Sequence, residues 1–320
     1  MNEVHEHDLQ FSANESGMRL DQALAIFFTQ YSRTSLKGWI EAGQVKVNGQ
    51  RVRPRYAVRP GDRVHLTATL DASQDLIPQP VDFEILHQDD ACIVVHKPAG
   101  CVVHPGAGNT GQTLVNGLIF RFPELAALPR AGLIHRLDKN TSGLLIVART
   151  SYAFQHLTRQ MAQRRIKRVY DALANGRFIG GGTVDAPIGR DPSNRTRMSV
   201  RGGGRNAVTH YRIAAKFRMH THLEVQLETG RTHQIRVHLA YIGHPITGDS
   251  RYGARVVLPP APHELLENRL RSFARQALHA RHIEFAHPTA ARTVVLDSPM
   301  PRDMIELLDA CAMDCSITDK

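Results

Sequence analysis

A polar loop that carries one carboxylate between two apolar runs constrains this chain most. The loop is Gly132-Leu-Ile-His-Arg-Leu-Asp-Lys-Asn-Thr-Ser-Gly143, and its carboxylate is Asp138. Leu133 and Ile134 lie before the polar residues and the aliphatic residues 144–148 lie after them. Short runs of this kind are typical of buried strands. The sequence therefore predicts a scaffold of two strands that holds Asp138 on a loop, where reacting groups are commonly found.

Basic charge is concentrated in the N-terminal part of the chain. The 320 residues include 40 Lys and Arg against 30 Asp and Glu, a formal charge of +10, and the pI is about 9.8. Residues 17–66 contain nine basic and three acidic side chains, whereas residues 1–16 are acidic and show no periodicity. This distribution favours a polyanionic partner. We expect a flexible arm over residues 1–16, followed by one small and one large domain.

Residues 17–77 predict a small module of helices and strands. Apolar side chains recur at helical spacing from Met18 to Phe28, and a second helix follows Ser32 and ends at Gly43. Residues 45–47 alternate like a strand, and Asn48-Gly49 marks a tight turn after them.

The module resembles an S4 RNA-binding domain. The segments that carry the resemblance are Arg19-Leu-Asp-Gln-Ala-Leu24, Ser32-Arg-Thr-Ser35, Ile40-Glu-Ala-Gly43, Val45-Lys-Val-Asn-Gly49 and Gly61-Asp62. The side chains expected to meet RNA phosphates from one side are Arg19, Arg33, Lys37, Arg51 and Arg53. The alternative reading is a basic surface that faces only solvent.

A larger domain is predicted over residues 78–320, after a linker that contains prolines. Strands are expected near residues 83–86, 92–95, 167–174, 210–217 and 222–228. Helices are expected over residues 114–122, up to about residue 165 on a face marked by Leu157, and up to Gly243 on a face marked by Leu239. Because the strands do not alternate regularly with helices, we expect an α+β fold with a mixed, mostly antiparallel sheet.

The sequence contains no signature of a metal site, a cofactor site or a membrane segment. The four cysteines form no Cys-x-x-Cys pair, and the 18 histidines include no His-Glu-x-x-His motif. No glycine-rich nucleotide fingerprint follows a predicted strand, and no apolar run approaches about 18 residues. We therefore expect a cytoplasmic protein with reduced thiols, no metal and no cofactor. A metal site made of histidines such as His135 and His233 is the alternative, and the neighbouring Arg and Lys residues oppose it.

Three separate stretches carry side chains that suit one reaction site. They are residues 135–138, 168–170 and 228–236, and they contain Asp138, Tyr170 and Arg231. Each has an ordinary structural reading when taken alone: a turn aspartate, a half-buried strand aromatic and a surface arginine. Their order changes that reading, because residues from about 80 onwards resemble the RluA-type pseudouridine synthases. The carriers are His96-Lys-Pro-Ala-Gly100, Val103-His-Pro-Gly-Ala-Gly108, residues 131–143, Arg168-Val-Tyr-Asp-Ala172, Thr209-His-Tyr211, residues 227–238, Gly243-His-Pro-Ile-Thr-Gly-Asp249 and Arg275-Gln-Ala-Leu-His279.

The resemblance implies an enzyme that isomerises uridine to pseudouridine in RNA. It assigns Asp138 as the nucleophile, which could attack the ribose C1′, act as a base at C2′ or add to the uracil. It assigns Arg231 as the cation that keeps Asp138 ionised, and Tyr170 as the aromatic residue beside the base. The target base would be flipped out of its stack. The residues expected to contact RNA near this site are His135, Arg136, Arg165 and Arg168.

With the S4 module in front, the resemblance implies a substrate in 23S ribosomal RNA, either free or in a precursor of the large ribosomal subunit. The implied target is the stem-loop of helix 69, and we expect a monomer. One position departs from the pattern: Asn140 stands where relatives commonly have a second aspartate. The amide removes a like charge two residues from Asp138, so ionisation of Asp138 becomes easier.

Two other classes of protein are alternatives to this reading. A non-catalytic RNA-binding factor for ribosome assembly would keep the fold without the reaction, and the joint presence of Asp138, Tyr170 and Arg231 opposes it. Another RNA enzyme with an S4 domain, such as a methyltransferase or an aminoacyl-tRNA synthetase, would need a glycine-rich cofactor loop or the synthetase signature motifs. Neither is present in the sequence.

Overall fold

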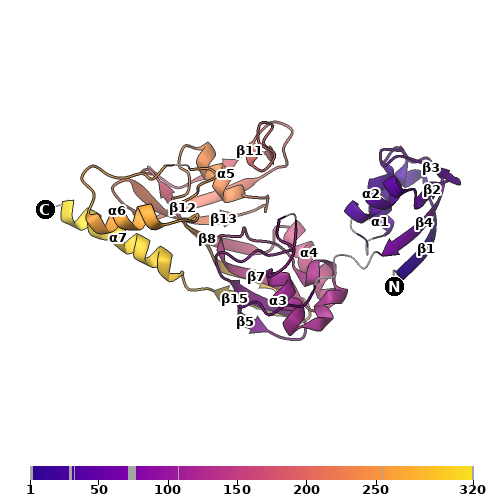
Figure 1. The fold of residues 1–320 in the computed structure, drawn as a ribbon, viewed down its shortest axis with the longest axis horizontal. Helices are drawn as coiled ribbons and strands as arrows, with labels where there is room; N and C mark the ends of the chain where they lie inside the picture. Colours follow the sequence, from indigo (N-terminus) through magenta and orange to yellow (C-terminus); the bar gives the residue numbers. More distant parts are fainter. Residues whose placement is uncertain are drawn as a thin grey trace. The chain divides into compact units, whose positions relative to one another are not determined.

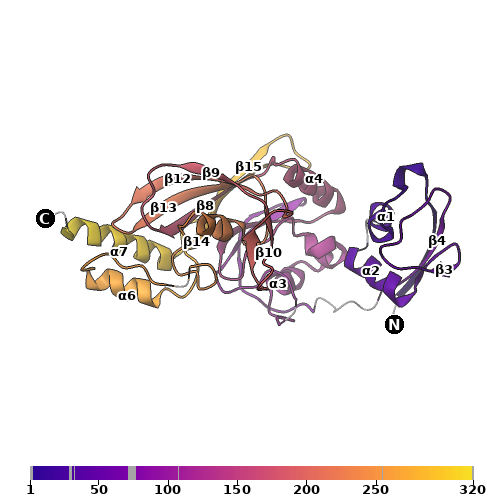
Figure 2. The same cartoon turned by 90° about the horizontal axis from the view of Figure 1, so that it is seen from above.

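The computed structural model describes residues 3–28, 31, 33–70, 77–106, 108–253 and 255–318. The chain forms two compact units, Met1–Ile77 and Pro78–Lys320, which can be followed by colour in Figures 1 and 2. The linker with prolines is predicted over residues 71–80, and residues 71–76 of it lie outside the described residues.

The first unit packs two helices, α1 (Leu20–Phe27) and α2 (Arg33–Ala42), against a small sheet. Its strands, in order across the sheet, are β1 (Glu3–Gln10), β4 (Arg63–Leu70), β2 (Val45–Val47) and β3 (Gln50–Arg51). A short 3-10 helix, η1 (Ala13–Glu15), precedes α1. The predicted turn after β2 is formed by Asn48 and Gly49, whose φ angles of 51° and 78° suit this dipeptide.

The prediction of a flexible arm over residues 1–16 has to be corrected. Residues 3–10 form β1, which pairs antiparallel with β4 from Glu3↔Leu70 to Gln10↔Arg63. His5, His7 and Leu9 alternate toward the unit, and the His7 ring shares a 2.7 Å hydrogen bond with the Tyr31 hydroxyl. The strand was missed because its inward positions are partly polar, so it lacks the apolar alternation that marks a strand in sequence.

The second unit is built on one large sheet, shown in Figure 1. Its nine strands among the described residues follow the order β5-β6-β7-β14-β8-β13-β12-β9, with β15 paired to β14. The strands are β5 (Glu84–Gln88), β6 (Cys92–Lys97), β7 (Ser142–Ala148), β14 (Leu278–Ala286), β8 (Lys167–Asn175), β13 (His220–Leu227), β12 (Val208–Lys216), β9 (Gly182–Asp185) and β15 (Thr293–Asp297). Only β7 and β14 pair in parallel among these strands. The α+β class with a mixed, mostly antiparallel sheet is confirmed.

Helices and a small hairpin surround this sheet. They are α3 (Leu114–Arg121), η2 (Pro123–Ala127), η3 (Pro129–Gly132), α4 (Ser151–Ala162), α5 (Gln234–Tyr241), α6 (Glu264–Ser272), α7 (Arg302–Thr318) and the hairpin of β10 (Ile188–Arg190) with β11 (Met198–Val200). α4 buries Ala153 and Leu157 against Ile146 and Phe285 of the sheet. The predicted helix over residues 114–122 matches α3, and α5 ends as expected at Gly243, whose φ is 84°.

One of the two strands predicted to flank the Asp138 loop is absent. Residues 144–148 lie in β7, but Leu133 makes only an isolated bridge to Val147, and the Ile134 N–H donates to the Ile146 carbonyl at 3.2 Å. Arg130, Ala131 and Gly132 all have left-handed backbone angles just before this point. This reversal leaves too little extended chain for a second strand.

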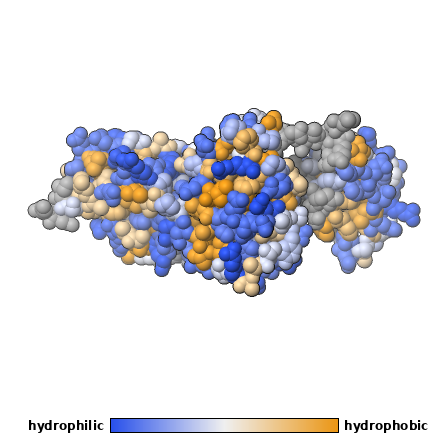
Figure 3. All heavy atoms as spheres, turned by 90° about the horizontal axis from the view of Figure 1, so that it is seen from below, coloured by the Kyte–Doolittle hydropathy of each residue, from blue (hydrophilic) through white to orange (hydrophobic). Residues whose placement is uncertain are grey.

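No helix of the described residues is both long and apolar enough to cross a membrane. On the face drawn in Figure 3, apolar side chains form small patches bordered by hydrophilic ones.

Candidate active site

Strand register brings the Asp138 loop beside Tyr170. Gly143, at the start of β7, pairs with Ala280 of β14, and Ala280 pairs in turn with Tyr170 of β8. A Cβ on Gly143 would collide with the backbone of Ala280, so only glycine allows this close approach. Asp138 lies five residues before Gly143, and its carbonyl accepts the Thr141 N–H at 3.1 Å to close the turn.

A fully buried lysine holds the backbone next to Asp138. The Lys97 Nζ donates to the carbonyls of Pro98 at 2.7 Å, Cys101 at 2.9 Å and Lys139 at 2.9 Å. Burial lowers the pKa of Lys97 to about 8. Three acceptors match the three N–H bonds of an ammonium group, so Lys97 ties the end of β6 to the catalytic loop.

Arg236, on α5, forms the ion pair with Asp138. Its Nη1 lies 2.8 Å from Asp138 Oδ2, while Nε and Nη2 bind Asp249 at 2.7 and 2.9 Å. Burial alone would lower the pKa of Arg236, but the bonds to Asp249 and Asp138 raise it. The guanidinium also lies 5.0 Å from the centre of the Tyr252 ring. Its orientation is therefore fixed, and one edge is left for Asp138.

Arg231 does not pair with Asp138, which corrects the sequence prediction. Its Nε donates to the Asn206 carbonyl at 3.0 Å, and its backbone N–H donates to Gln234 Oε1 at 2.9 Å. Burial, followed by the nearby Arg205 and Arg164 cations, lowers the pKa of Arg231. Arg231 thus lies in a group of arginines instead of facing the carboxylate.

His233 separates the two arginines and explains the difference between them. Its backbone is left-handed, with φ 57° and ψ 22°, and α5 begins at the next residue. The sharp turn places Arg236 in the first turn of the helix, where it reaches Asp138. The His233 Nε2 lies 3.8 Å from Asp138 Oδ1, and its Nδ1 shares a 2.7 Å hydrogen bond with the Tyr252 hydroxyl. Arg236, Asp249 and His233 were missed as site residues, because the burial of Asp249, which requires a cation nearby, cannot be read from the sequence.

Tyr170 lies in the middle of the sheet with 5% of its surface exposed. Burial raises the pKa of Tyr170, Arg168 acts against this, and Asp138 adds to it. The phenol therefore stays protonated at neutral pH. Sequence placed this residue in the same site as Asp138, and the strand register brings the two together.

Two residues expected to contact RNA, the half-buried His135 and the buried Arg168, do not present an exposed cation. His135 Nε2 accepts the Ile146 N–H at 3.3 Å, and burial, together with Arg168, lowers the pKa of His135 to about 3. A neutral imidazole tied to a strand is not a phosphate-binding cation. Arg168 is only 6% exposed, so it belongs to the interior of the site and not to a basic surface.

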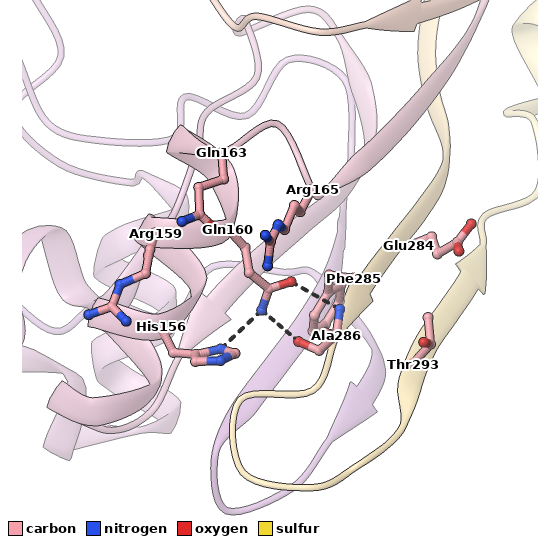
Figure 4. A pocket seen from close by; sticks show the side chains of 9 residues that line it. All are labelled: His156, Arg159, Gln160, Gln163, Arg165, Glu284, Phe285, Ala286 and Thr293. Atoms are coloured by element: carbon pink, nitrogen blue, oxygen red, sulfur yellow. Dashed lines mark hydrogen bonds between the residues drawn. The ribbon is translucent and has the colours of Figure 1, made fainter.

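Arg136 and Arg165 are exposed, as a contact with RNA requires. Arg165 and Arg159 line a hollow of about 460 Å³ beside β14 and β15, shown in Figure 4. The Gln160 amide closes its inner side through hydrogen bonds with the Ala286 backbone at 2.8 and 3.0 Å.

Of the basic residues predicted in the first unit, Arg51 and Arg53 are exposed. The side chain of Arg19, 40% exposed, binds Asp21 at 2.8 Å, and Lys37, 52% exposed, lies 3.3 Å from Glu41. The side chain of Arg33 lies outside the described residues.

The described residues contain one group with metal-ligand spacing: His87, Asp89, Cys92 and His287. The His287 Nδ1 accepts the Ala290 N–H at 2.9 Å, so Nε2 must carry the ring proton, which it donates to Asp89 at 2.8 Å. Burial raises the pKa of Cys92 to about 12, which keeps the thiol protonated. The group is arranged as a hydrogen-bond network and offers no lone-pair set for a cation.

Comparison with known proteins agrees with this geometry. The sequence matches the family described as RNA pseudouridylate synthase over residues 91–241 and the S4 domain over residues 18–64. "Ribosomal large subunit pseudouridine synthase D" of Xanthomonas campestris is 47% identical, and the match covers 93% of this chain and 90% of that protein. The protein of that name from Pseudomonas aeruginosa is 45% identical and covers 93% of both chains.

A solved structure supports the same assignment. Human RNA Pseudouridylate Synthase Domain Containing 4 is 26% identical, with a TM-score of 0.56 over 72% of this chain and 93% of that chain. The resemblance predicted from the sequence motifs is confirmed. The chain belongs to the RNA pseudouridylate synthase family and is an RNA pseudouridine synthase that carries an S4 domain ahead of its catalytic domain.

Proposed function

We propose that this enzyme converts uridines of large-subunit (23S) ribosomal RNA to pseudouridine, with Asp138 as nucleophile. The observation that carries the proposal is the ion pair of Asp138 with Arg236, 2.8 Å long, close enough to Tyr170 for the charge of Asp138 to act on the phenol. The names of the two bacterial relatives support the large ribosomal subunit as the source of the substrate.

The isomerisation breaks the bond between N1 of uracil and C1′ of ribose, turns the base and joins C5 to C1′. Arg236 donates a charged hydrogen bond to Asp138, while Asp249 fixes the orientation of the guanidinium. The side chain of Asp138 is 17% exposed, so a substrate can reach it from solvent. Attack at C1′, removal of a proton at C2′ and addition to the base all need this carboxylate.

Tyr170 is proposed to stack on the uracil and to relay the proton released from C5. Its raised pKa makes it a neutral phenol, which can pass a proton on through its hydroxyl. A uridine stacked in a helix hides C1′ and C5, so the base is flipped out toward Asp138. The unstacking costs about a few kcal/mol, and this cost is smallest for a base in a loop. The stem-loop of helix 69 is the target that we propose.

Two basic surfaces are proposed to hold the RNA. Arg136 and Arg165 contact the backbone near the flipped base, and the S4 unit provides a second contact through Arg51 and Arg53, with Arg19, Arg33 and Lys37. The enzyme would act as a monomer in the cytoplasm, where ribosomal RNA precursors are assembled.

Asp138→Asn provides the test. Purified enzyme is incubated with a transcript of the helix 69 stem-loop or with unmodified large subunits, and pseudouridine is mapped by chemical probing. We expect wild type to convert the loop uridines and Asp138→Asn to convert none, with RNA affinity within about threefold of wild type because the amide keeps the shape of the carboxylate. Equal absence of pseudouridine with both proteins would instead indicate a non-catalytic assembly factor, and clear residual activity of the variant would remove Asp138 from its role.

A further inference from the structure

We propose that Arg168 is a catalytic residue that donates hydrogen bonds to the carbonyl oxygens of uracil while the detached base carries negative charge. This inference rests on the proposed function, because it assigns one more group to the same reaction.

Arg168 is a buried cation without a protein partner. Its side chain is 6% exposed, and within the described residues none of its nitrogens has a hydrogen bond or an ion pair; Nε is fully enclosed. Arg236, which is buried to a similar degree, binds two carboxylates. An unpaired buried charge is costly, by about several kcal/mol, and such groups persist mainly where a ligand completes them.

The guanidinium of Arg168 lies on the same side of the sheet as Tyr170. The two residues are two positions apart on β8, so their side chains point to the same face. Nη1 lies against Gly230, in the turn before α5, where a Cβ would come within 2.8 Å of it. Its charge acts on Tyr170 and on His135 of the catalytic loop. Arg168 therefore lies between Tyr170 and the turn that leads to Arg236.

The reaction creates an anion at this place. When Asp138 attacks C1′, a new C1′–O bond forms and the electron pair of the C1′–N1 bond leaves with uracil, whose negative charge spreads over O2 and O4. Removal of the C2′ proton by Asp138 expels the same anion, and addition of Asp138 to C6 places the charge on O4. In the first route the C5–C1′ bond then forms as the bond from Asp138 to C1′ breaks. In the second route Asp138 returns its proton to C2′ as C5 bonds to C1′, and in the third the C1′–N1 bond breaks, C5 bonds to C1′ and the bond from Asp138 to C6 breaks. In each route C5 loses its proton and N1 takes one up, so no other reactant is needed.

The uracil anion is a better match for Arg168 than a phosphate group is. The exposed cations Arg136 and Arg165 remain for the phosphodiester backbone, whereas Arg168 lies in the wall beside the aromatic ring that receives the base. A preorganised donor in a site that excludes water stabilises developing charge strongly, and loss of one such donor costs about 100- to 1,000-fold in rate. A phosphate oxygen is the other source of the same chemistry, and the experiment must separate the two.

The test compares RNA stem-loops with uridine or 5-fluorouridine at the target position, in single turnovers with enzyme in excess. Consumption of the N-glycoside is followed by nuclease digestion and chromatography. Fluorine withdraws electrons and stabilises the uracil anion by itself. We expect Arg168→Met to slow consumption of uridine about 100-fold or more, to slow 5-fluorouridine at least tenfold less, and to bind RNA within about threefold of wild type. Arg168→Lys, which keeps the charge, should recover part of the rate.

Three results would overturn the inference: an unchanged rate, the same slowing with both bases, or a loss confined to RNA affinity, which would assign Arg168 to a phosphate. Arg165→Met is the comparison variant, and it should weaken binding equally for both RNAs. If Arg168→Met does not fold, Arg168→Gln and Arg168→Lys carry the same comparison of the two bases. Wild type is assayed with uridine RNA in the same experiment. If wild type fails to consume uridine, that result counts against the proposed function and not against Arg168 alone.

Discussion

At the scale of single residues, the site depends on one guanidinium shared by two carboxylates. Arg236 binds Asp249 through two nitrogens and Asp138 through the third. A lysine has one nitrogen and cannot make this set of bonds. Hydrogen bonds to charged groups contribute about 1.5–3 kcal/mol. Because this bond holds the proposed nucleophile, its loss should affect the reaction more than the binding of RNA.

We therefore expect Arg236→Lys to lower kcat about 10- to 100-fold, which is the loss of that bond expressed as a rate. Arg231→Lys is the matched control in the same segment; because Arg231 Nε binds a backbone carbonyl, it should keep kcat within about threefold and change mainly the KM for RNA. Steady-state kinetics on the stem-loop measure both. The opposite ranking of the two variants would restore Arg231 as the partner of Asp138.

The choice between Arg231 and Arg236 could not be made from sequence. Both lie in the segment that carries the family likeness, and the left-handed turn at His233 lies between them. Asp138 drew attention because it lies on a polar loop between apolar residues, whereas Tyr170 was assigned only through the resemblance. Arg168 was assigned to the surface because charge alone does not report burial.

At the scale of elements, helices with apolar faces and strands with β-branched residues were predictable, whereas contacts between elements were not. β1 was missed because half-buried histidines replaced apolar residues. A polar network that joins the β5–β6 turn to the β14–β15 turn was also missed, since Asp89 and His287 are 198 residues apart and share a 2.8 Å bond. Pairing over such a distance leaves no local pattern.

This network makes stability depend on acidity. Burial acts to raise the pKa of Asp89, but N–H groups of Cys92 and Ala91 and the two histidines lower it overall. A carboxyl group with a lowered folded pKa stabilises the fold above its unfolded value, about 4, and that stabilisation is lost as pH falls below it. We expect Asp89→Asn to be less stable than wild type in urea unfolding at pH 7 and the difference to shrink steadily between about pH 4 and pH 2. A difference that is constant with pH would mean that the charge of Asp89 contributes nothing.

At the scale of the whole molecule, both units are proposed to bind RNA. Arg51, Arg53 and Arg55 are exposed in the first unit, and each phosphate contact steepens the dependence of binding on salt. We expect their joint replacement by Gln to reduce the slope of log K against log salt by about two, while kcat at saturating RNA is unchanged. Arg302→Gln, on α7 and 91% exposed, is the control and should leave the slope as it is. An unaltered slope for the triple variant would remove the S4 unit from binding.

The ionic groups beside Asp138 nearly balance one another, although the chain as a whole carries a charge of +10. Asp138 and Asp249 are two carboxylates, and Arg236, Arg168 and Lys97 are three basic groups. A group of charges that sums to a single positive charge pulls only weakly on a distant polyanion, while exposed cations around it pull more strongly. In the proposed reaction, attraction would draw the sugar-phosphate chain to the rim and leave the interior to an uncharged ring, so the enzyme would sort the parts of a single nucleotide by charge before any bond is broken.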